Sequence, residues 1–96
     1  MSINYDMLPE HMRDGMQRYI ERGIPPGSFL TAVLENNLVL AALRADSVNR
    51  HRLLDFAEFL YSEAPTMCWG SRGSVELWVK RGGLQGLRGR RGDERR

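Results

Sequence analysis

Residues 53–65 decide the fold, and they read Leu53-Leu54-Asp55-Phe56-Ala57-Glu58-Phe59-Leu60-Tyr61-Ser62-Glu63-Ala64-Pro65. The apolar side chains recur at helical spacing and form one stripe of Leu53, Phe56, Ala57, Leu60 and Ala64. Because a helix that is apolar around most of its circumference is enclosed by its neighbours, we expect the central helix of the fold here. We predict that this helix follows an N-cap at Asp46 or Ser47 and that Pro65 ends it near Ala64.

A second amphipathic helix is predicted earlier in the chain, from Pro9 to residue 22. Proline suits the first turn of a helix, and four later side chains share one apolar face, namely Met12, Met16, Tyr19 and Ile20. Gly23 follows them and is predicted to be the C-terminal cap. Gly15 lies inside this helix, where glycine costs about 1 kcal/mol relative to alanine. We interpret Gly15 as a point of close packing against a neighbouring element.

The segment between these helices begins with a stiff connector, Pro25-Pro26-Gly27. Ser28 is predicted to be the N-cap of a helix whose apolar residues are Phe29, Leu30, Val33 and Leu34. We predict that Asn36-Asn37 ends this helix and that residues 38–44 form another. The apolar phase continues across the two asparagines, so a single helix over residues 28–44 remains an alternative.

The last part of the chain contains a loop over residues 66–71 and a short helix. Ser71 is the predicted N-cap of that helix, Gly82-Gly83 ends it, and its inward face consists of Val75, Trp78 and Val79. No segment shows the sustained alternation of apolar and polar residues that is typical of a strand. The predicted fold is therefore all-α, a compact orthogonal bundle of four to five short helices.

Charge divides the chain into a body and a tail. Residues 1–83 carry nine Lys or Arg and ten Asp or Glu side chains, so their net charge is 9 − 10 = −1. Residues 84–96, which we call the tail, carry five Arg and two acidic side chains, a net charge of 5 − 2 = +3. A segment rich in Gly and Arg buries too little apolar surface to offset its ordering entropy. We therefore predict one helical domain over residues 1–83 and a flexible, disordered basic tail.

The composition excludes several classes of protein. A chain of 96 residues is long enough for one small domain, and a single cysteine excludes an internal disulfide framework. No apolar run approaches the ~20 residues of a membrane span, and residues 1–6 lack the features of a signal peptide. We therefore expect a cytoplasmic protein with no membrane partner, and the oligomeric state stays open.

The residues that could carry chemistry are few. His11, His51 and Cys68 are the strongest soft-metal ligands, but they are far apart and show no CxxC or HxxxH spacing. A catalytic thiol needs a neighbouring base, and we favour a buried Cys68 that packs under Trp69. We expect no catalytic residue, no metal site and no cofactor, and we do not expect an enzyme.

Two sets of residues remain as candidate binding sites. Trp69 is a large aromatic side chain in a glycine-flanked loop, and it is paired here with Arg72 as a partner-binding site. The second set lies in the tail and could contact nucleic acid through phosphates and stacking, and it consists of Arg88, Arg90, Arg91, Arg95 and Arg96. Because the body is almost neutral, any binding of nucleic acid is expected to be weak and non-specific.

Two stretches carry a resemblance. The first is residues 23–34, GIPPGSFLTAVL, and the second is Glu63-Ala64-Pro65 followed by Cys68-Trp69-Gly70-Ser71. In these stretches the chain resembles a set of small proteins encoded in tailed bacteriophages and prophages. The resemblance covers about residues 12–83, and the tail lies outside it. It implies an origin and a size class, with the host-cell cytoplasm as the expected location, but it implies no chemistry.

Together these features lead to two hypotheses of function. The first is a small, non-enzymatic phage or prophage accessory protein that binds another protein, expected to be a host protein. Inhibition of a host enzyme or defence system is one form that this binding could take. The alternative is an accessory protein that binds nucleic acid through its Arg-rich tail.

The tail hypothesis makes a direct prediction. Replacing Arg88, Arg90 and Arg91 with Ala should remove the weak, sequence-independent binding of duplex DNA while leaving capture of a protein partner unchanged. Asp93 and Glu94 offset part of the charge, so we expect about three effective phosphate contacts and a correspondingly shallow salt dependence. Fluorescence anisotropy with two unrelated duplexes, at low and at physiological salt, measures this. Tight, sequence-selective binding that persists in salt would reverse the order of the two hypotheses.

Overall fold

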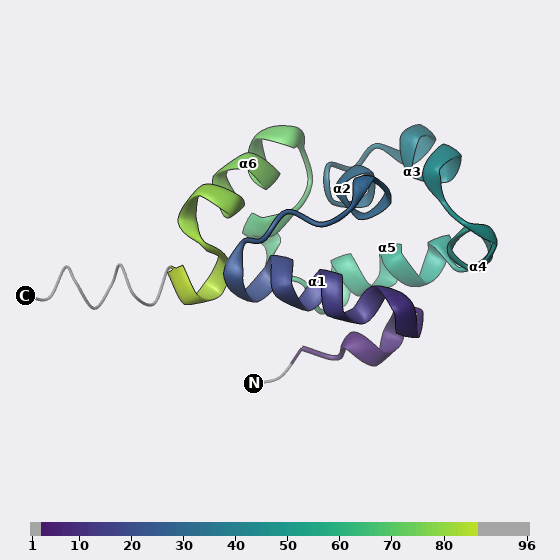
Figure 1. Cartoon of the computed structure of the whole chain (residues 1–96), viewed down its shortest axis with the longest axis horizontal. Helices are drawn as coiled ribbons and strands as arrows, with labels where there is room; N and C mark the ends of the chain where they lie inside the picture. The colour runs from purple at the N-terminus through teal and green to yellow at the C-terminus, as the bar shows by residue number, and fades with distance from the viewer. Residues whose placement is uncertain (1–2, 87–96) are drawn as a thin grey trace, which may run out of the picture.

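A computed structural model describes residues 3–86, and this range contains helices and no strand (Figure 1). The predicted all-α class is confirmed. In chain order the elements are η1 (Tyr5–Met7), α1 (Glu10–Arg22), α2 (Ser28–Leu34), α3 (Leu38–Arg44), α4 (Ser47–His51), α5 (Leu53–Ser62), η2 (Thr66–Cys68) and α6 (Arg72–Arg81). The two η elements are 3₁₀ helices of three residues each.

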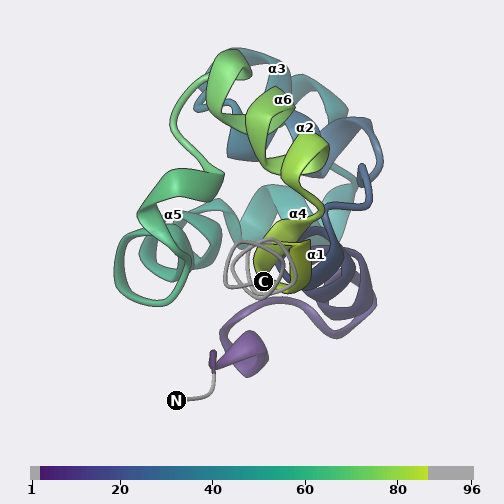
Figure 2. The same cartoon turned by 90° about the vertical axis from the view of Figure 1, so that its left-hand side faces the viewer.

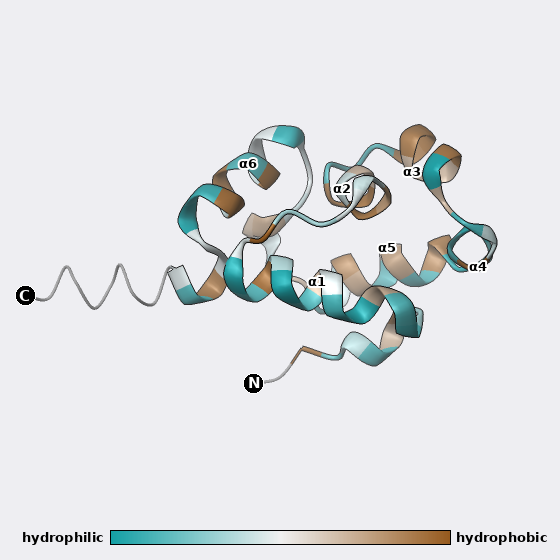
Figure 3. Ribbon diagram, viewed as in Figure 1, coloured by the Kyte–Doolittle hydropathy of each residue, from teal (hydrophilic) through white to brown (hydrophobic). Residues whose placement is uncertain are grey.

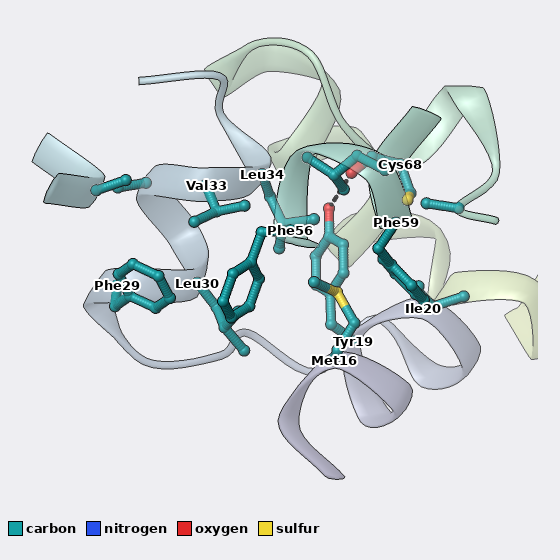
Figure 4. Close-up of a cluster of buried hydrophobic side chains, with 14 of the residues drawn as sticks. Met16, Tyr19, Ile20, Phe29, Leu30, Val33, Leu34, Phe56, Phe59 and Cys68 are labelled. Atoms are coloured by element: carbon teal, nitrogen blue, oxygen red, sulfur yellow. Dashed lines mark hydrogen bonds between the residues drawn. The ribbon is translucent and has the colours of Figure 1, made fainter. Parts of the chain in front are cut away.

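The helices form two layers that enclose one core. Helices α2, α3 and α6 lie in one layer, and α1 and α5 lie in the other, with η1 outside them (Figure 1 and Figure 2). The largest fully buried side chains come from both layers and include Met16, Tyr19, Ile20, Leu30, Leu34, Phe56, Phe59 and Trp78. Phe29 and Phe56 meet edge to face across the layers, with ring centroids 5.1 Å apart (Figure 4), a favoured arrangement for aromatic pairs.

Helix α1 ends at Arg22 as predicted, but it begins at Glu10, one residue later than predicted. Gly23 ends it in the left-handed conformation (φ 71°), and its N–H donates to the Tyr19 carbonyl at 2.8 Å. Pro9 occupies the N-cap position, one residue before the first turn. A β-carbon on Gly15 would lie 3.3 Å from Leu30 Cδ1, so this glycine lets α1 approach α2 closely. The interpretation of Gly15 as a packing position is therefore confirmed.

Asn36 and Asn37 separate α2 from α3, as predicted. Asn36 adopts a left-handed conformation (φ 63°), which asparagine tolerates better than most residues. The Asn37 side chain then caps α3 by accepting from the Leu40 N–H at 3.1 Å. A single helix over residues 28–44 is thereby excluded. The expected cap at Ser28 is wrong by one residue, because Gly27 holds the cap position and Ser28 begins the helix.

The predicted long helix over residues 47–64 is two helices. Asp46 caps α4 by accepting from the Asn49 N–H at 2.8 Å, but the chain leaves helical geometry at Arg52 (φ −120°, ψ 21°). The Arg52 guanidinium donates to the Met7 carbonyl at 3.1 Å and to Asp55 at 2.7 Å. These bonds hold the break in place. With it, the described residues contain six α-helices where four to five were predicted.

Helix α5 is also less enclosed than its composition indicates. Phe56, Phe59 and Leu60 are buried, whereas Leu54 and Tyr61 are 69% and 88% exposed. Within residues 3–86, no element covers the side of α5 that carries those two residues. The helix ends at Ser62, two residues before the predicted position. The expectation of a mostly enclosed central helix is therefore corrected to a helix with one apolar face in solvent.

The C-terminal end of the described chain packs against the end of α1. Gly82 ends α6 in the left-handed conformation (φ 81°), and helical backbone resumes at residues 83–86. A β-carbon on Gly83 would lie 2.6 Å from the Arg22 nitrogen, so only glycine permits this contact. Leu84, which the sequence assigns to the tail, packs against the core. The predicted disorder of the rest of the tail concerns residues 87–96, which lie outside the described residues.

Burial on α5 yields a stability prediction. Leu60 is 5% exposed, so Leu60→Ala should lower the free energy of unfolding by about 2–5 kcal/mol through lost transfer energy and a residual cavity. Leu54→Ala, on the exposed side of the same helix, should change it by less than about 0.5 kcal/mol. Urea unfolding measures both, and equal effects of the two substitutions would contradict the assigned helix faces.

Candidate protein-binding face

An apolar groove lies between the two layers at the end of the molecule that carries α3. Its lining comes from the end of α2, the α2–α3 turn, α3 and α5, and consists of Val33, Asn36, Asn37, Leu38, Ala41, Leu53, Phe56, Ala57 and Leu60. Its volume is about 100 Å³, below the ~150 Å³ of an apolar cavity that holds benzene. The groove therefore has room for about one aliphatic side chain.

Exposed apolar side chains border this groove on both helices. Leu38, Val39 and Leu43 of α3 are 72%, 69% and 75% exposed. Leu54 and Tyr61 of α5 continue the surface, and Figure 3 shows hydrophobic residues on both helices at this end of the molecule. Five large exposed apolar side chains on two helices that border one groove make these helices the candidate interaction surface.

We call this surface the α3–α5 face and define it by the groove together with Leu38, Val39, Leu43, Arg44, Leu54, Ala57, Glu58 and Tyr61. The face extends across α5, where a second shallow hollow is lined by Met7, Ala57, Glu58, Tyr61 and Ser62. Ala57 lines both hollows. The small alanine between the larger Leu54 and Tyr61 thus leaves a depression in the exposed side of α5.

The charged groups of the face are few, and two of them lack an ion partner among residues 3–86. Asp55 pairs with Arg52 at 2.7 Å, and Glu63 accepts from the Asn4 N–H at 2.8 Å. Glu58 on α5 and Arg44 at the end of α3 form no salt bridge within the described range. One free carboxylate and one free guanidinium therefore border an otherwise apolar surface.

The predicted binding residues Trp69 and Arg72 lie outside this face. Trp69 is half-buried against the core, and its indole N–H is enclosed without an acceptor among the described residues. The Gly70 N–H ties the loop to the Leu34 carbonyl at 2.8 Å. Arg72 is exposed and faces Glu76 one turn further along α6 at 3.4 Å. At the predicted loop site, the Arg72 guanidinium is exposed, but the indole nitrogen of Trp69 is not accessible to solvent.

Trp78 and Cys68 belong to the interior. The Trp78 indole N–H donates to the carbonyls of Tyr19 and Ile20 at 3.0 and 3.2 Å. The Tyr19 hydroxyl donates to the Cys68 carbonyl at 2.7 Å (Figure 4). Burial raises the pKa of the Cys68 thiol to about 12, so at neutral pH the thiol is protonated and is no nucleophile. The interpretation of Cys68 as a buried structural residue is confirmed.

The two histidines stabilise helix ends. His11 Nε2 lies 3.0 Å from Asp46 Oδ2, and His51 Nδ1 lies 2.7 Å from the Ser47 carbonyl. The Asn49 backbone N–H, with a smaller contribution from His11, holds the pKa of the Asp46 carboxyl below its ordinary value. Among residues 3–86, no three His, Cys, Asp or Glu side chains gather as metal ligands would.

The sequence pattern contained a signal for the α3–α5 face that the sequence analysis did not use. Residues 38–43 are all apolar, Leu38-Val39-Leu40-Ala41-Ala42-Leu43, and a helix of this composition cannot bury its whole circumference in a small two-layer fold. The predicted nucleic-acid-binding arginines, Arg88, Arg90, Arg91, Arg95 and Arg96, lie outside the described residues, so that prediction stays untested.

No protein-family model, curated protein or solved structure matches the chain. The longest described helix, α1, has 13 residues, and within the described range no helix combines the length and apolar character that crossing a bilayer requires. The geometry of the α3–α5 face is therefore the main structural basis for a functional hypothesis.

The buried thiol predicts how stability depends on pH. In the unfolded chain the Cys68 thiol ionises near its ordinary pKa of 9.0, and in the folded chain near 12. Between these values the unfolded state loses the proton first, so the free energy of unfolding should fall by up to about 1.4 kcal/mol per pH unit.

Urea unfolding at pH 8, 9, 10 and 11 measures this loss, and Cys68→Ala should reduce its slope. Burial also raises the pKa of Tyr5 and Tyr19, so part of the decline above pH 10 should remain in the variant. Stability that rises with pH over this range would contradict the burial of all three groups.

Proposed function

We propose that this protein is a small, non-enzymatic accessory protein that acts by binding another protein through the α3–α5 face. One observation carries the proposal. Leu38 and Leu43 of α3 and Leu54 and Tyr61 of α5 each expose at least two thirds of their surface, and the two helices border one apolar groove. Burying one such side chain fully in an interface is more favourable than leaving it in water by about 1.5–3 kcal/mol.

The dimensions of the face favour a protein over a small molecule. The groove holds about 100 Å³, whereas pockets for drug-sized ligands are typically about 300–1,000 Å³ and bury most of the ligand. The apolar surface also continues beyond the groove onto the outer sides of α3 and α5. A partner that inserts one side chain into the groove and covers both helices fits this shape, which is how binding energy concentrates in protein interfaces.

The absence of enzymatic activity is part of the proposal. Within residues 3–86, the one thiol is buried and protonated, and each histidine makes a contact at a helix end. None of these groups lies beside the groove. Nucleophilic or acid–base catalysis needs such groups next to a cavity that admits substrate.

The resemblance to tailed-bacteriophage and prophage proteins suggests the setting. A compact helical protein without catalytic groups can act by covering a functional surface of its target. We therefore propose a host protein as the partner, with inhibition of a host enzyme or defence system as the mode of action. The choice of a host protein as partner rests on the resemblance, whereas the choice of the α3–α5 face rests on the exposed side chains and the groove.

Capture experiments with matched variants test the proposal. The wild-type protein should recover one stoichiometric protein from a lysate of the bacterium that carries the gene. Leu54→Asp should reduce that recovery roughly tenfold or more, because a carboxylate would be buried in the centre of the contact. Arg72→Ala, which alters the loop predicted from sequence, should leave recovery unchanged.

The opposite pattern would refute the assigned face, since loss with Arg72→Ala and retention with Leu54→Asp would place the site at the Trp69 loop. Recovery of mixed nucleic-acid-binding proteins that disappears after nuclease treatment would favour the nucleic-acid alternative. Circular dichroism of each variant confirms that the helical fold is intact before capture is compared.

A further inference from the structure

We propose that the end of the molecule where α1 and α6 finish is a second binding surface, which takes the phosphate backbone of a nucleic acid. We call it the basic end and define it by the two helix-capping turns and the chain that follows α6, residues 18–24 and 78–86. It is separate from the α3–α5 face, because α3 lies at the opposite end of the molecule (Figure 1). It also differs from the tail hypothesis, because side chains of the folded body contribute to it.

The fold brings the two capping turns together, although they are far apart in the sequence. A β-carbon on Gly83 would lie 2.6 Å from the Arg22 nitrogen, and one on Gly82 would lie 3.9 Å from the Arg22 carbonyl oxygen. Arg81 directly precedes Gly82, so the backbones of Arg22 and Arg81 are neighbours in space. Figure 2 views the molecule from this end, with α1 and α6 side by side. The cations that the fold gathers here are Arg18, Arg22, Lys80 and Arg81.

Charge is divided unevenly between the basic end and the rest of the chain. The basic end contains these four cations and one acid, Glu21, so its net charge is 4 − 1 = +3. Residues 87–96 follow it directly and add 5 − 2 = +3, which makes +6. Because the whole chain carries +2, the remaining residues carry 2 − 6 = −4. The almost neutral body therefore contains a separation of charge, and a basic patch on a folded element is a feature of nucleic-acid-binding proteins.

The helix dipoles account for only a part of these cations. The C-terminal end of a helix carries about −0.5 elementary charge, so the ends of α1 and α6 together require about one positive charge. Backbone N–H groups of both caps already donate to the carbonyls at these ends. The net charge of the basic end exceeds that requirement, and Arg18, Arg22 and Lys80 are exposed. These side chains can therefore meet an external anion.

The chemistry of the basic end favours a nucleic acid over a lipid surface. Stable membrane anchoring needs a second signal beside a basic cluster, such as inserted apolar side chains. Within residues 3–86, the large apolar side chains that are exposed by two thirds or more lie on α3 and α5, away from the basic end. Double-stranded DNA offers one phosphate charge per ~1.7 Å of its axis, so the cations of the body and of the tail can each meet a phosphate.

The same composition indicates which part of the nucleic acid is contacted. Residues 84–96 contain no aromatic side chain that could stack on bases. Contacts to phosphates position a protein on a duplex but carry no sequence information directly. Binding at the basic end is therefore independent of sequence and depends steeply on salt.

The salt dependence of duplex binding tests the proposal. A net charge of +3 from the basic end and +3 from residues 87–96 should neutralise about six phosphates, which gives a slope of log K against log salt near −5. The affinity of the wild-type chain for a fluorescein-labelled DNA duplex should therefore fall about 10³-fold between about 50 and 200 mM salt. Fluorescence anisotropy measures this loss, and an unrelated duplex should give the same values.

Two charge-matched double variants separate the position of the cations from their number. Arg22→Gln with Lys80→Gln removes two cations of the basic end and should reduce the loss over the same salt range to about 10²-fold. Arg44→Gln with Arg50→Gln removes two exposed cations at the α3–α4 end and should leave the slope unchanged, because salt screens charges beyond about 10 Å. Circular dichroism checks that both variants keep the helical fold.

A variant of the tail distinguishes the basic end from a tail that acts alone. Replacing Arg88, Arg90 and Arg91 with Ala leaves the cations of the folded body in place. This variant should therefore still bind the duplex at low salt, with a slope near −3, whereas the tail hypothesis expects binding to be lost.

Each other outcome overturns the proposal. Loss of all binding in the tail variant excludes a contribution from the body, and equal slopes for the two double variants show that net charge alone matters. Association with phosphatidylserine vesicles without binding to the duplex assigns the basic end to a lipid surface. These results are independent of the capture experiment, because Leu54→Asp should leave duplex binding unchanged and Arg22→Gln with Lys80→Gln should leave recovery of the protein partner unchanged.

Discussion

The hydrogen bond on which the rest of the structure depends joins the Trp78 indole to the end of α1. The carbonyls in the last turn of a helix lack donors from further helical residues, and the Trp78 N–H is shared by two of them, that of Ile20 and that of Tyr19, which also accepts from the Gly23 cap. The Tyr19 hydroxyl in turn donates to the Cys68 carbonyl just before the Trp69 loop. All these groups are buried, so each bond strengthens in a low-dielectric interior and would be costly to leave unmade. Together they fix α1, η2 and α6 relative to one another.

These hydrogen bonds also help to explain why the two ends of the molecule differ in how tightly their helices are packed. At the Trp78 end, Gly23 and Gly83 bring the backbones of α1 and the chain after α6 into direct contact. At the other end, α3 packs on the core through the buried Ala41 and the partly buried Leu40, whereas Leu38, Val39 and Leu43 are exposed. The stability of the fold is thus concentrated away from the α3–α5 face, which leaves that face free to carry exposed apolar groups without threatening the core.

Local chemistry explains what could be predicted from the sequence. Gly23, Asn37 and Asp46 each end or begin a helix through bonds to residues within a few positions, so their roles follow from residue type and order. The break at Arg52 depends instead on its bond to the Met7 carbonyl, 45 residues away, which no local pattern contains. The exposure of Leu54 and Tyr61 was missed for a related reason. Periodicity indicates which apolar residues share a helix face. It does not indicate whether a neighbouring helix covers that face.

The shallow anchoring of α3 has a consequence for motion. A seven-residue helix is too short to be stable by itself in water, and α3 is held by the buried Ala41, the partly buried Leu40 and its Asn37 cap. Segments with few buried apolar contacts open at a lower free energy than the whole protein unfolds. The amide protons of α3 should therefore exchange with solvent well before those of α1 and α6. The helix that presents the largest apolar side chains is then also the part of the chain whose shape can adjust to whatever covers it.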